Sequence, residues 1–193
     1  MSTVNSLIQT VTILWIASEI LLSFLKRAGN KSKDFDKSNS LILWIVNILS
    51  IMIGINIAVR SGDSGIGSFP PGYPLLSYVG LLLILSGIAV RWTAILTLGK
   101  QFTMTLTIVE NHQIIDGGIY RYIRHPSYTG ALMSFLGLSI AFANWISFIV
   151  IFVPILSCYI YRIHVEEKLL VHHFGEAYVS YARKTHRLIP KVY

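Results

Sequence analysis

Two groups of residues in the second half of the chain could do chemistry together. Residues 117–130 combine glycine, proline, tyrosine, arginine and histidine in one short run. Further along, Arg162 and Glu166 are four positions apart, so they share a face if this segment is helical, and Glu167 lies beside them. An arginine fork suits a carboxylate and a glutamate suits a cation, so these residues indicate a site for groups of both charges.

The run of residues 117–130 has two interpretations. Pro126 is suited to the first position of a helix, where unbonded backbone N–H groups can bind an anionic or carbonyl group. The same residues could instead form a structural glycine turn, flanked by aromatic and basic side chains at a membrane surface. For the second group, Arg162 before Glu166 is the weaker order for stabilising a helix, which makes surface support a poor explanation.

Three other features are weaker candidates. Residues 61–67 resemble the nucleophile motif of serine proteases, but the outer segments offer no histidine to act as the base, so we expect a flexible loop. Glu19 and Arg91 fall within apolar segments, where we expect them to snorkel or to pair with each other rather than to catalyse. The histidines lack the spacing of metal ligands, so no metal site is predicted, and solvent-facing positions are expected for His164, His172, His173 and His186.

The elements that position these residues are predicted to be membrane helices. The chain has 193 residues, of which 53% are apolar and 13% charged, whereas a soluble domain carries about 25% charged residues. Residues 4–25, 41–59 and 75–98 are each long enough to cross a bilayer as a helix. Residues 128–161 are too long for one crossing and are interrupted at Asn144, which leaves two arms of about 24 Å. We therefore predict an all-α membrane protein with about five transmembrane helices, the last two forming a tight hairpin.

The distribution of basic residues predicts the orientation. With the N-terminus outside, Arg60 is the only outer basic residue of the sixteen, so the positive-inside rule places the C-terminus and the candidate site on the cytoplasmic face. The net charge of +7 is then explained by topology and anionic lipid, and no nucleic-acid partner is expected. We divide the chain into residues 1–98, three helices with a basic inner loop, and residues 99–193, which contain the candidate site, the hairpin and a C-terminal tail.

The second half of the chain resembles the isoprenylcysteine carboxyl methyltransferase family. The family signature is matched by Gly118, Tyr120, Arg124, His125, Pro126, Tyr128 and Gly130. A downstream pattern is matched by Arg162, Glu166, Glu167, Phe174, Gly175, Tyr178, Tyr181, Thr185, Arg187 and Pro190. The match covers roughly residues 99–193, and the first three helices agree only in type. The resemblance implies that residues 99–193 are the catalytic region, with a cofactor-binding loop and a cofactor pocket on the inner face.

The resemblance implies an integral membrane enzyme that uses S-adenosyl-L-methionine to methylate the carboxylate of a prenylated cysteine or a similar lipid-modified acid. It implies that Arg162 holds the substrate carboxylate and that Arg162 and Glu166 are catalytic. Thr107 aligns with a polar residue that the family often carries before the cofactor segment. The residues implied in cofactor binding are His112, Gln113, Ile114, Ile115, Tyr120, His125, Pro126, Ser127, Tyr128, Glu166 and Glu167.

This chemistry agrees with the residue types. A carboxylate has an unperturbed pKa near 4 and is already ionised, so no general base is required. Catalysis would come from alignment and from exclusion of water. The prenyl tail would enter laterally from the bilayer, because moving it into water costs about 0.8 kcal/mol per CH₂.

Three alternatives differ in substrate or class. A phospholipid or small-molecule methyltransferase is the closest alternative. A sterol-type membrane reductase is less favoured, since the sequence lacks a Gly-x-Gly-x-x-Gly fingerprint for a nicotinamide cofactor. A small transporter is expected to show internal repeats, and none is evident.

Overall fold

The computed structural model of the chain describes residues 2–25, 34–69, 74–104, 106, 108 and 112–193. The predicted contributor Thr107 and the loop residues Lys26, Arg27, Lys31 and Lys33 lie outside the described residues.

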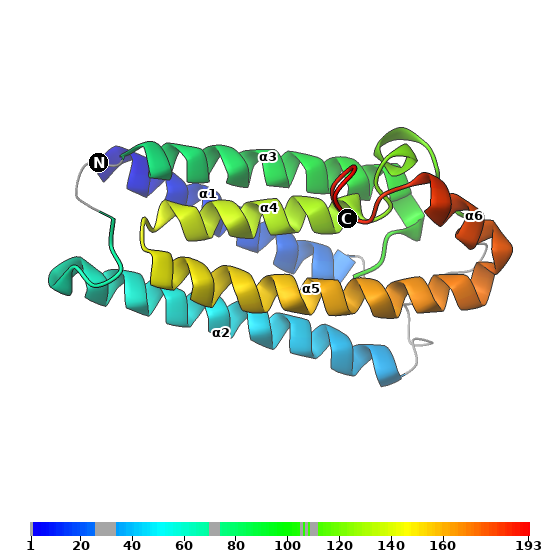
Figure 1. Cartoon of the computed structure of the whole chain (residues 1–193), viewed down its shortest axis with the longest axis horizontal. Helices are drawn as coiled ribbons and strands as arrows, with labels where there is room; N and C mark the ends of the chain where they lie inside the picture. The colour runs from blue at the N-terminus through cyan, green and yellow to red at the C-terminus, as the bar shows by residue number, and fades with distance from the viewer. Residues whose placement is uncertain (1, 26–33, 70–73, 105, 107, 109–111) are drawn as a thin grey trace.

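Five apolar helices run along the long axis of the molecule (Figure 1). Their bounds are α1 (Ser2–Leu25), α2 (Asp34–Ser64), α3 (Pro74–Leu98), α4 (Pro126–Ala141) and α5 (Trp145–Phe174). The described residues contain no strand beyond isolated bridges, so the all-α prediction is confirmed. The break near Asn144 is also confirmed, because α4 and α5 form a hairpin around it.

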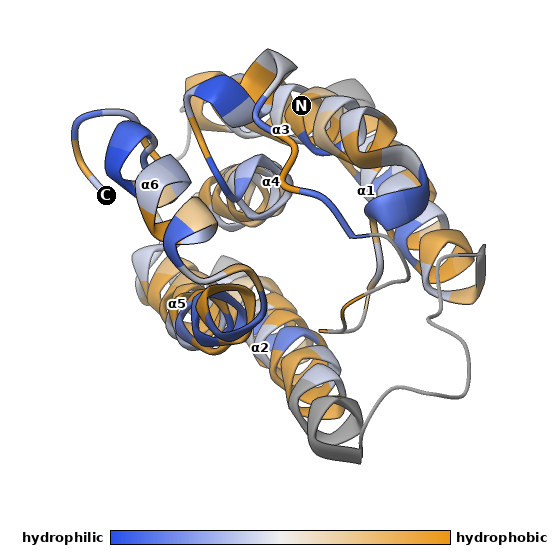
Figure 2. Cartoon of the chain, turned by 90° about the vertical axis from the view of Figure 1, so that its right-hand side faces the viewer, coloured by the Kyte–Doolittle hydropathy of each residue, from blue (hydrophilic) through white to orange (hydrophobic). Residues whose placement is uncertain are grey.

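Four of these helices, α1, α2, α3 and α5, are long and apolar enough to cross a membrane. The fifth, α4, has 16 residues and lies alongside α3 and α5 (Figure 1). Apolar residues dominate the helices (Figure 2). Large side chains such as Leu14, Phe24 and Leu96 are exposed on the helix surfaces. Such a surface is stable only against lipid, so the chain is an integral membrane protein.

Helices α3 and α4 approach each other closely through glycines spaced seven residues apart. A Cβ atom on Gly87 would lie 2.5 Å from the Gly130 carbonyl oxygen, and one on Gly137 would lie 2.5 Å from the Gly80 carbonyl oxygen. Backbone contact of this kind requires residues without a side chain. The close approach brings the end of α3, with Arg91, against the beginning of α4, where Pro126 occupies the predicted first helical position.

The turn between α4 and α5 lies at the end of the bundle that carries the N-terminus (Figure 1). This turn includes Asn144, which is 2% exposed. Its side chain accepts a hydrogen bond from the Ser147 N–H over 2.9 Å, capping α5, and donates to the Ile66 carbonyl over 3.0 Å. The predicted flexible loop over residues 61–67 is therefore wrong in part: α2 continues to Ser64, and the following residues are bonded to the turn between α4 and α5.

The opposite end carries the short elements η1 (Gly99–Gln101), η2 (Gly118–Arg121) and α6 (Glu176–Lys184). Gly118 begins η2 with a φ of 58°, a conformation that favours glycine. The C-terminal tail returns to this segment: the Arg124 N–H donates to the His186 carbonyl over 2.9 Å, and the His186 N–H donates to the Tyr122 carbonyl over 3.0 Å. Backbone hydrogen bonds thus join the segment of residues 118–125 to the C-terminal tail.

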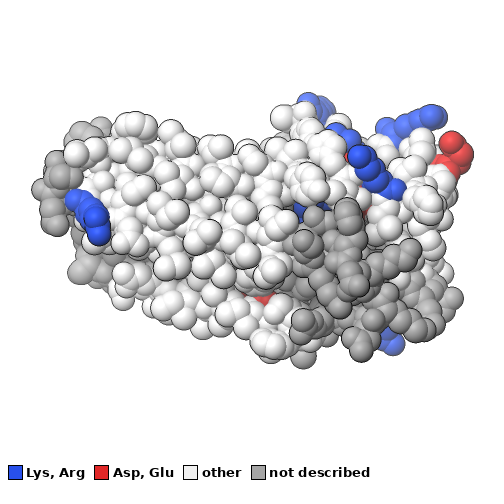
Figure 3. All heavy atoms as spheres, turned by 90° about the horizontal axis from the view of Figure 1, so that it is seen from below, with Lys and Arg blue, Asp and Glu red and all other residues white. Residues whose placement is uncertain are grey.

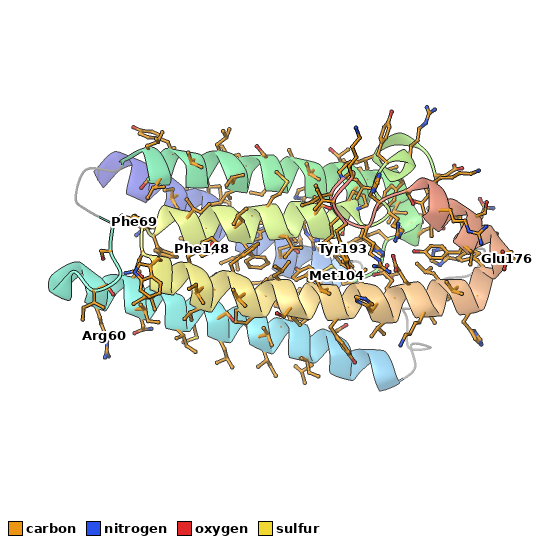
Figure 4. All side chains as sticks on the ribbon, viewed as in Figure 1. Arg60, Phe69, Met104, Phe148, Glu176 and Tyr193 are labelled. Atoms are coloured by element: carbon orange, nitrogen blue, oxygen red, sulfur yellow. The ribbon has the colours of Figure 1, made fainter. Side chains whose placement is uncertain are left out.

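The two ends of the bundle differ in charge. Arg60 lies at the end that carries the N-terminus (Figures 1 and 4). The face drawn in Figure 3 is almost free of charged side chains along its middle, and its basic residues gather mainly toward the end that carries α6. The described chain therefore has the basic asymmetry on which the orientation was predicted.

Candidate functional site

A cavity of about 240 Å³ lies in the part of the bundle near α6. Its polar end is lined by residues that include Tyr178 and Tyr181 of α6, and its apolar end by residues that include Trp15 of α1 and Ile51 of α2. Both halves of the chain therefore contribute to one cavity.

The structure brings nearly all of the predicted site residues to this cavity. Those that line it are His112, Gln113, Ile114, Ile115, Tyr120, His125, Ser127, Tyr128, Arg162 and Glu166. Pro126 and Glu167 are the two predicted site residues that are not part of the lining. Pro126 is fully buried at the beginning of α4.

Arg162 and Glu166 are connected through the hydroxyl group of Tyr128. Arg162 Nε donates to Tyr128 Oη over 2.9 Å, and Tyr128 Oη donates to Glu166 Oε2 over 2.7 Å. Arg162 is 5% exposed and also donates to the Ser40 hydroxyl over 3.2 Å and to the Met104 carbonyl over 2.6 Å. Arg162 and Glu166 thus share a helical face, as their spacing predicts, and their side chains are joined by hydrogen bonds in the cavity wall.

His125 lies behind this arrangement. Its ring stacks on Tyr128, with centroids 5.6 Å apart and an interplanar angle of 7°. Its backbone carbonyl accepts hydrogen bonds from the N–H groups of Tyr128 and Thr129, both over 3.1 Å. The bond from Thr129 is the ordinary first hydrogen bond of the helix, whereas the Tyr128 N–H is one of the groups expected to be available at this helix start and is already bonded. His125 therefore holds Tyr128 in place from two sides.

Glu167 faces the C-terminal tail. Its carboxylate accepts from Arg124 Nε over 2.5 Å, from Arg187 Nε over 2.9 Å and from His125 Nε2 over 3.3 Å. Arg124 also donates to the Thr185 carbonyl over 2.5 Å. Glu167 consequently joins α5, the segment before α4 and the tail.

The polar end of the cavity contains buried groups that lack a hydrogen-bond partner within the described chain, namely His112 Nδ1 and Tyr178 Oη. Burial, together with the nearby imidazole of His173, lowers the pKa of His112, so the His112 ring is neutral at neutral pH. Burial raises the pKa of Tyr178, so its hydroxyl remains a donor. Such buried unpaired groups are costly in isolation, and they favour a polar ligand at this end.

Glu19 and Arg91 also line the cavity. Arg91 Nε and Nη2 both donate to the Glu19 carboxylate, the latter over 2.6 Å, so the predicted mutual pairing is confirmed. The lining also includes the aromatic residues Trp15, Trp44 and Phe135.

Sequence reasoning missed several residues of the lining. Phe174, Tyr178 and Tyr181 match the downstream family pattern but were not assigned to the site, although the pattern itself was the signal. The aromatic wall from α1 and α2 carried no such signal, because Trp15 and Trp44 read as ordinary membrane-helix residues. The four histidines predicted to face solvent, His164, His172, His173 and His186, are all exposed.

Comparison with known proteins places the chain among membrane methyltransferases. Residues 75–177 match the model of the phospholipid methyltransferase family. A probable protein-S-isoprenylcysteine O-methyltransferase from Oryza sativa subsp. indica is 34% identical over 120 residues, which cover 61% of this chain and 63% of that protein. Protein-S-isoprenylcysteine O-methyltransferase B from Arabidopsis thaliana is 37% identical over 119 residues, covering 61% of this chain and 60% of that protein.

A solved structure shares the fold. The eukaryotic intramembrane Ras methyltransferase, isoprenylcysteine carboxyl methyltransferase, superposes with a TM-score of 0.64 at 22% identity, covering 98% of this chain and 67% of that one. The alignments span less than two thirds of the length of the curated relatives. Together these matches confirm the predicted resemblance.

Proposed function

Because the chain belongs to the phospholipid methyltransferase family, we propose that it is an enzyme that transfers a methyl group from S-adenosyl-L-methionine to the carboxylate of a prenylated cysteine or a similar lipid-modified acid. The curated relatives named above support this acceptor. The observation that carries the proposal is the Arg162–Tyr128–Glu166 connection, which sets an arginine fork and a carboxylate at a fixed separation in one cavity.

The residues at the polar end fit the methyl donor. Glu166 offers a negative charge to its amino or sulfonium group, and His112 Nδ1 and Tyr178 Oη offer unpaired polar atoms. His112, Gln113, Ile114, Ile115, Tyr120, His125, Ser127 and Tyr128 complete this part of the wall. When bound, S-adenosylmethionine supplies an electrophilic methyl group on a positively charged sulfur.

The chain's own contribution is to hold and align the acceptor. Arg162 binds the acceptor carboxylate at an angle fixed by its contacts with Tyr128 and Met104. The carboxylate is ionised at neutral pH, so no side chain needs to remove a proton. Aromatic and aliphatic residues exclude water from the reacting groups, which strengthens every charge interaction among them. Pro126 and Glu167 act by positioning: Pro126 begins α4, and Glu167 holds the tail.

The two parts of the chain have complementary roles in this proposal. Residues 99–193 carry the donor site and Arg162, while residues 1–98 supply a large part of the apolar wall along which the lipid tail of the acceptor lies. The tail enters laterally from the bilayer, because passage through water would cost about 0.8 kcal/mol per CH₂. The family model's description favours one second candidate, a phospholipid whose headgroup amine is the methyl acceptor.

An acceptor assay tests the proposal directly. Purified protein is first titrated calorimetrically with S-adenosylhomocysteine, and methylation of N-acetyl-S-farnesylcysteine and of phosphatidylethanolamine is then compared using a labelled methyl donor. We expect binding, and transfer to the farnesylated acid only. Transfer to the amine lipid alone would establish the second candidate, and absence of cofactor binding would exclude both.

We further propose that the end of the bundle carrying α6 faces the cytoplasm and that the N-terminus lies outside, as the basic asymmetry indicates. With Cys158 replaced by serine, single cysteines at the exposed positions Ile66 and Lys184 form a matched pair on opposite ends. A membrane-impermeant thiol reagent added to intact cells should label Ile66→Cys and leave Lys184→Cys unlabelled. The reverse pattern would invert the orientation.

A further inference from the structure

Glu19 and Arg91 form a two-point ion pair inside the cavity in which the proposed acceptor is bound. Arg91 is 5% exposed, and both residues belong to the lining. Two nitrogens of the guanidinium group donate to the two oxygens of Glu19, and Trp15 Nε1 donates to Glu19 Oε1 over 3.3 Å. The side of the arginine fork that could bind a carboxylate of a ligand is therefore occupied by a carboxylate of the protein.

The remaining contacts of Arg91 place it close to the acceptor-binding residues. Arg91 Nη1 donates to the Ser127 carbonyl over 3.1 Å and to its hydroxyl over 3.4 Å. Arg91 Nη2 lies 3.9 Å from Met104 Sδ, and the Met104 carbonyl accepts from Arg162. Both guanidinium groups thus contact Met104, which is labelled in Figure 4, and both face the same cavity.

We infer that Glu19 masks Arg91, so that the acceptor carboxylate is held by Arg162 alone; this inference rests on the proposed function. A carboxylate shared by two guanidinium forks in a low-dielectric cavity would be bound very tightly before reaction. Binding energy gained equally in the ground state does not lower the barrier to transfer. With Glu19 in place, the charge of Arg91 is neutralised, and its contacts with Ser127 still hold the beginning of α4.

A purely structural role for the same pair makes a different prediction. If the pair only ties α1 to α3, its loss should weaken the binding of every ligand in the cavity alike. If Glu19 masks Arg91, its loss should strengthen the binding of an acid and leave an uncharged ester of the same shape unaffected. The ratio of acid to ester affinity therefore separates the two roles.

The test compares wild type with Glu19→Gln, which keeps the size of the side chain and removes its charge. In the presence of S-adenosylhomocysteine, the affinities for N-acetyl-S-farnesylcysteine and for its methyl ester are measured for each protein. We expect the acid-to-ester preference to rise about 10-fold in Glu19→Gln, since charge-assisted hydrogen bonds to Arg91 become available. In turnover with the acid, both KM and kcat should fall. Glu176→Gln, which removes the same charge on α6 well away from Met104, should leave the preference unchanged (Figure 4).

A double variant keeps the inference testable if Glu19→Gln does not fold. Glu19→Gln with Arg91→Gln removes both charges, which a buried site tolerates better than a single unpaired one. Because Arg91 is masked in the wild type, the double variant should keep the wild-type acid-to-ester preference. Loss of that preference would show that Arg91 itself binds the carboxylate and would overturn the inference, as would an unchanged preference in folded Glu19→Gln.

Failure of the inference and failure of the proposed function give different results. If the inference alone is wrong, wild type still binds and methylates the acid. If wild type shows no preference for the acid over the ester, the proposed acceptor is wrong, and the inference falls with it.

Discussion

Glu166 and Glu167 are adjacent in α5, yet their carboxylates bind different parts of the molecule. Glu166 accepts a hydrogen bond from Tyr128 over 2.7 Å inside the cavity. Glu167 accepts from Arg124 over 2.5 Å and from Arg187 over 2.9 Å, outside the lining. The Glu166 carboxylate therefore lies in the cavity, whereas the Glu167 carboxylate holds the C-terminal tail, so the same substitution at each should have separable effects.

Glu166→Gln should weaken binding of the methyl donor. Glutamine still accepts a hydrogen bond from Tyr128, but the cationic part of the donor loses its counter-charge. A hydrogen bond to a charged group contributes about 1.5–3 kcal/mol, which corresponds to about a 10- to 150-fold loss of affinity. Calorimetric titration with S-adenosylmethionine measures the change, and unchanged affinity in the folded variant would remove Glu166 from the donor site.

Glu167→Gln should instead lower the stability of the protein. The side chain binds two arginines and His125, so loss of its charge weakens the attachment of the tail. We expect the free energy of unfolding to fall by about 1.5–3 kcal/mol, measured by denaturation in detergent. Glu166→Gln is the matched control and should lose less. Equal losses in the two variants would contradict the assignment.

Arg162→Lys should reduce methylation of N-acetyl-S-farnesylcysteine by about 100-fold, because lysine keeps the charge but lacks the planar fork that fixes the angle of a carboxylate. Affinity for S-adenosylhomocysteine should stay close to that of wild type, since Arg162 is assigned to the acceptor. Both quantities are measured on the same preparation. Full activity in the variant would exclude a carboxylate-aligning role for Arg162.

Gly130→Ala should destabilise the packing of α3 against α4. The added Cβ would lie 2.5 Å from the backbone nitrogen of Arg91 and 2.5 Å from the Gly87 carbonyl oxygen, so the helices must separate. Overpacking of this kind costs about 1–3 kcal/mol. Thermal unfolding measures the loss, and Gly117→Ala is the control, because a Cβ there meets no described atom within 4 Å. Equal stability of the two variants would be evidence against a tight glycine contact.

Much of the architecture is determined locally and was therefore predictable from the sequence. The apolar runs are long enough to form membrane helices on their own, and they do so at α1, α2 and α3. The break at Asn144 was visible because a polar residue interrupts an apolar run, and the structure shows that it caps α5. The spacing of Arg162 and Glu166 placed them on one helical face, which depends only on the helix period.

The partners of these residues depend on contacts between distant segments, which spacing does not encode. The family resemblance implied that both Glu166 and Glu167 bind the cofactor, but adjacent helical positions point in different directions, and only Glu166 lines the cavity. That difference is set by the packing of α5 against its neighbours and by the returning tail, which supplies Arg187. Glu19 and Arg91 are 72 residues apart, and only the tertiary structure turns their predicted pairing into a part of the cavity wall. A charge in an apolar environment is costly unless it is paired. The packing of the helices, and not the sequence of any single segment, determines which residue that partner is.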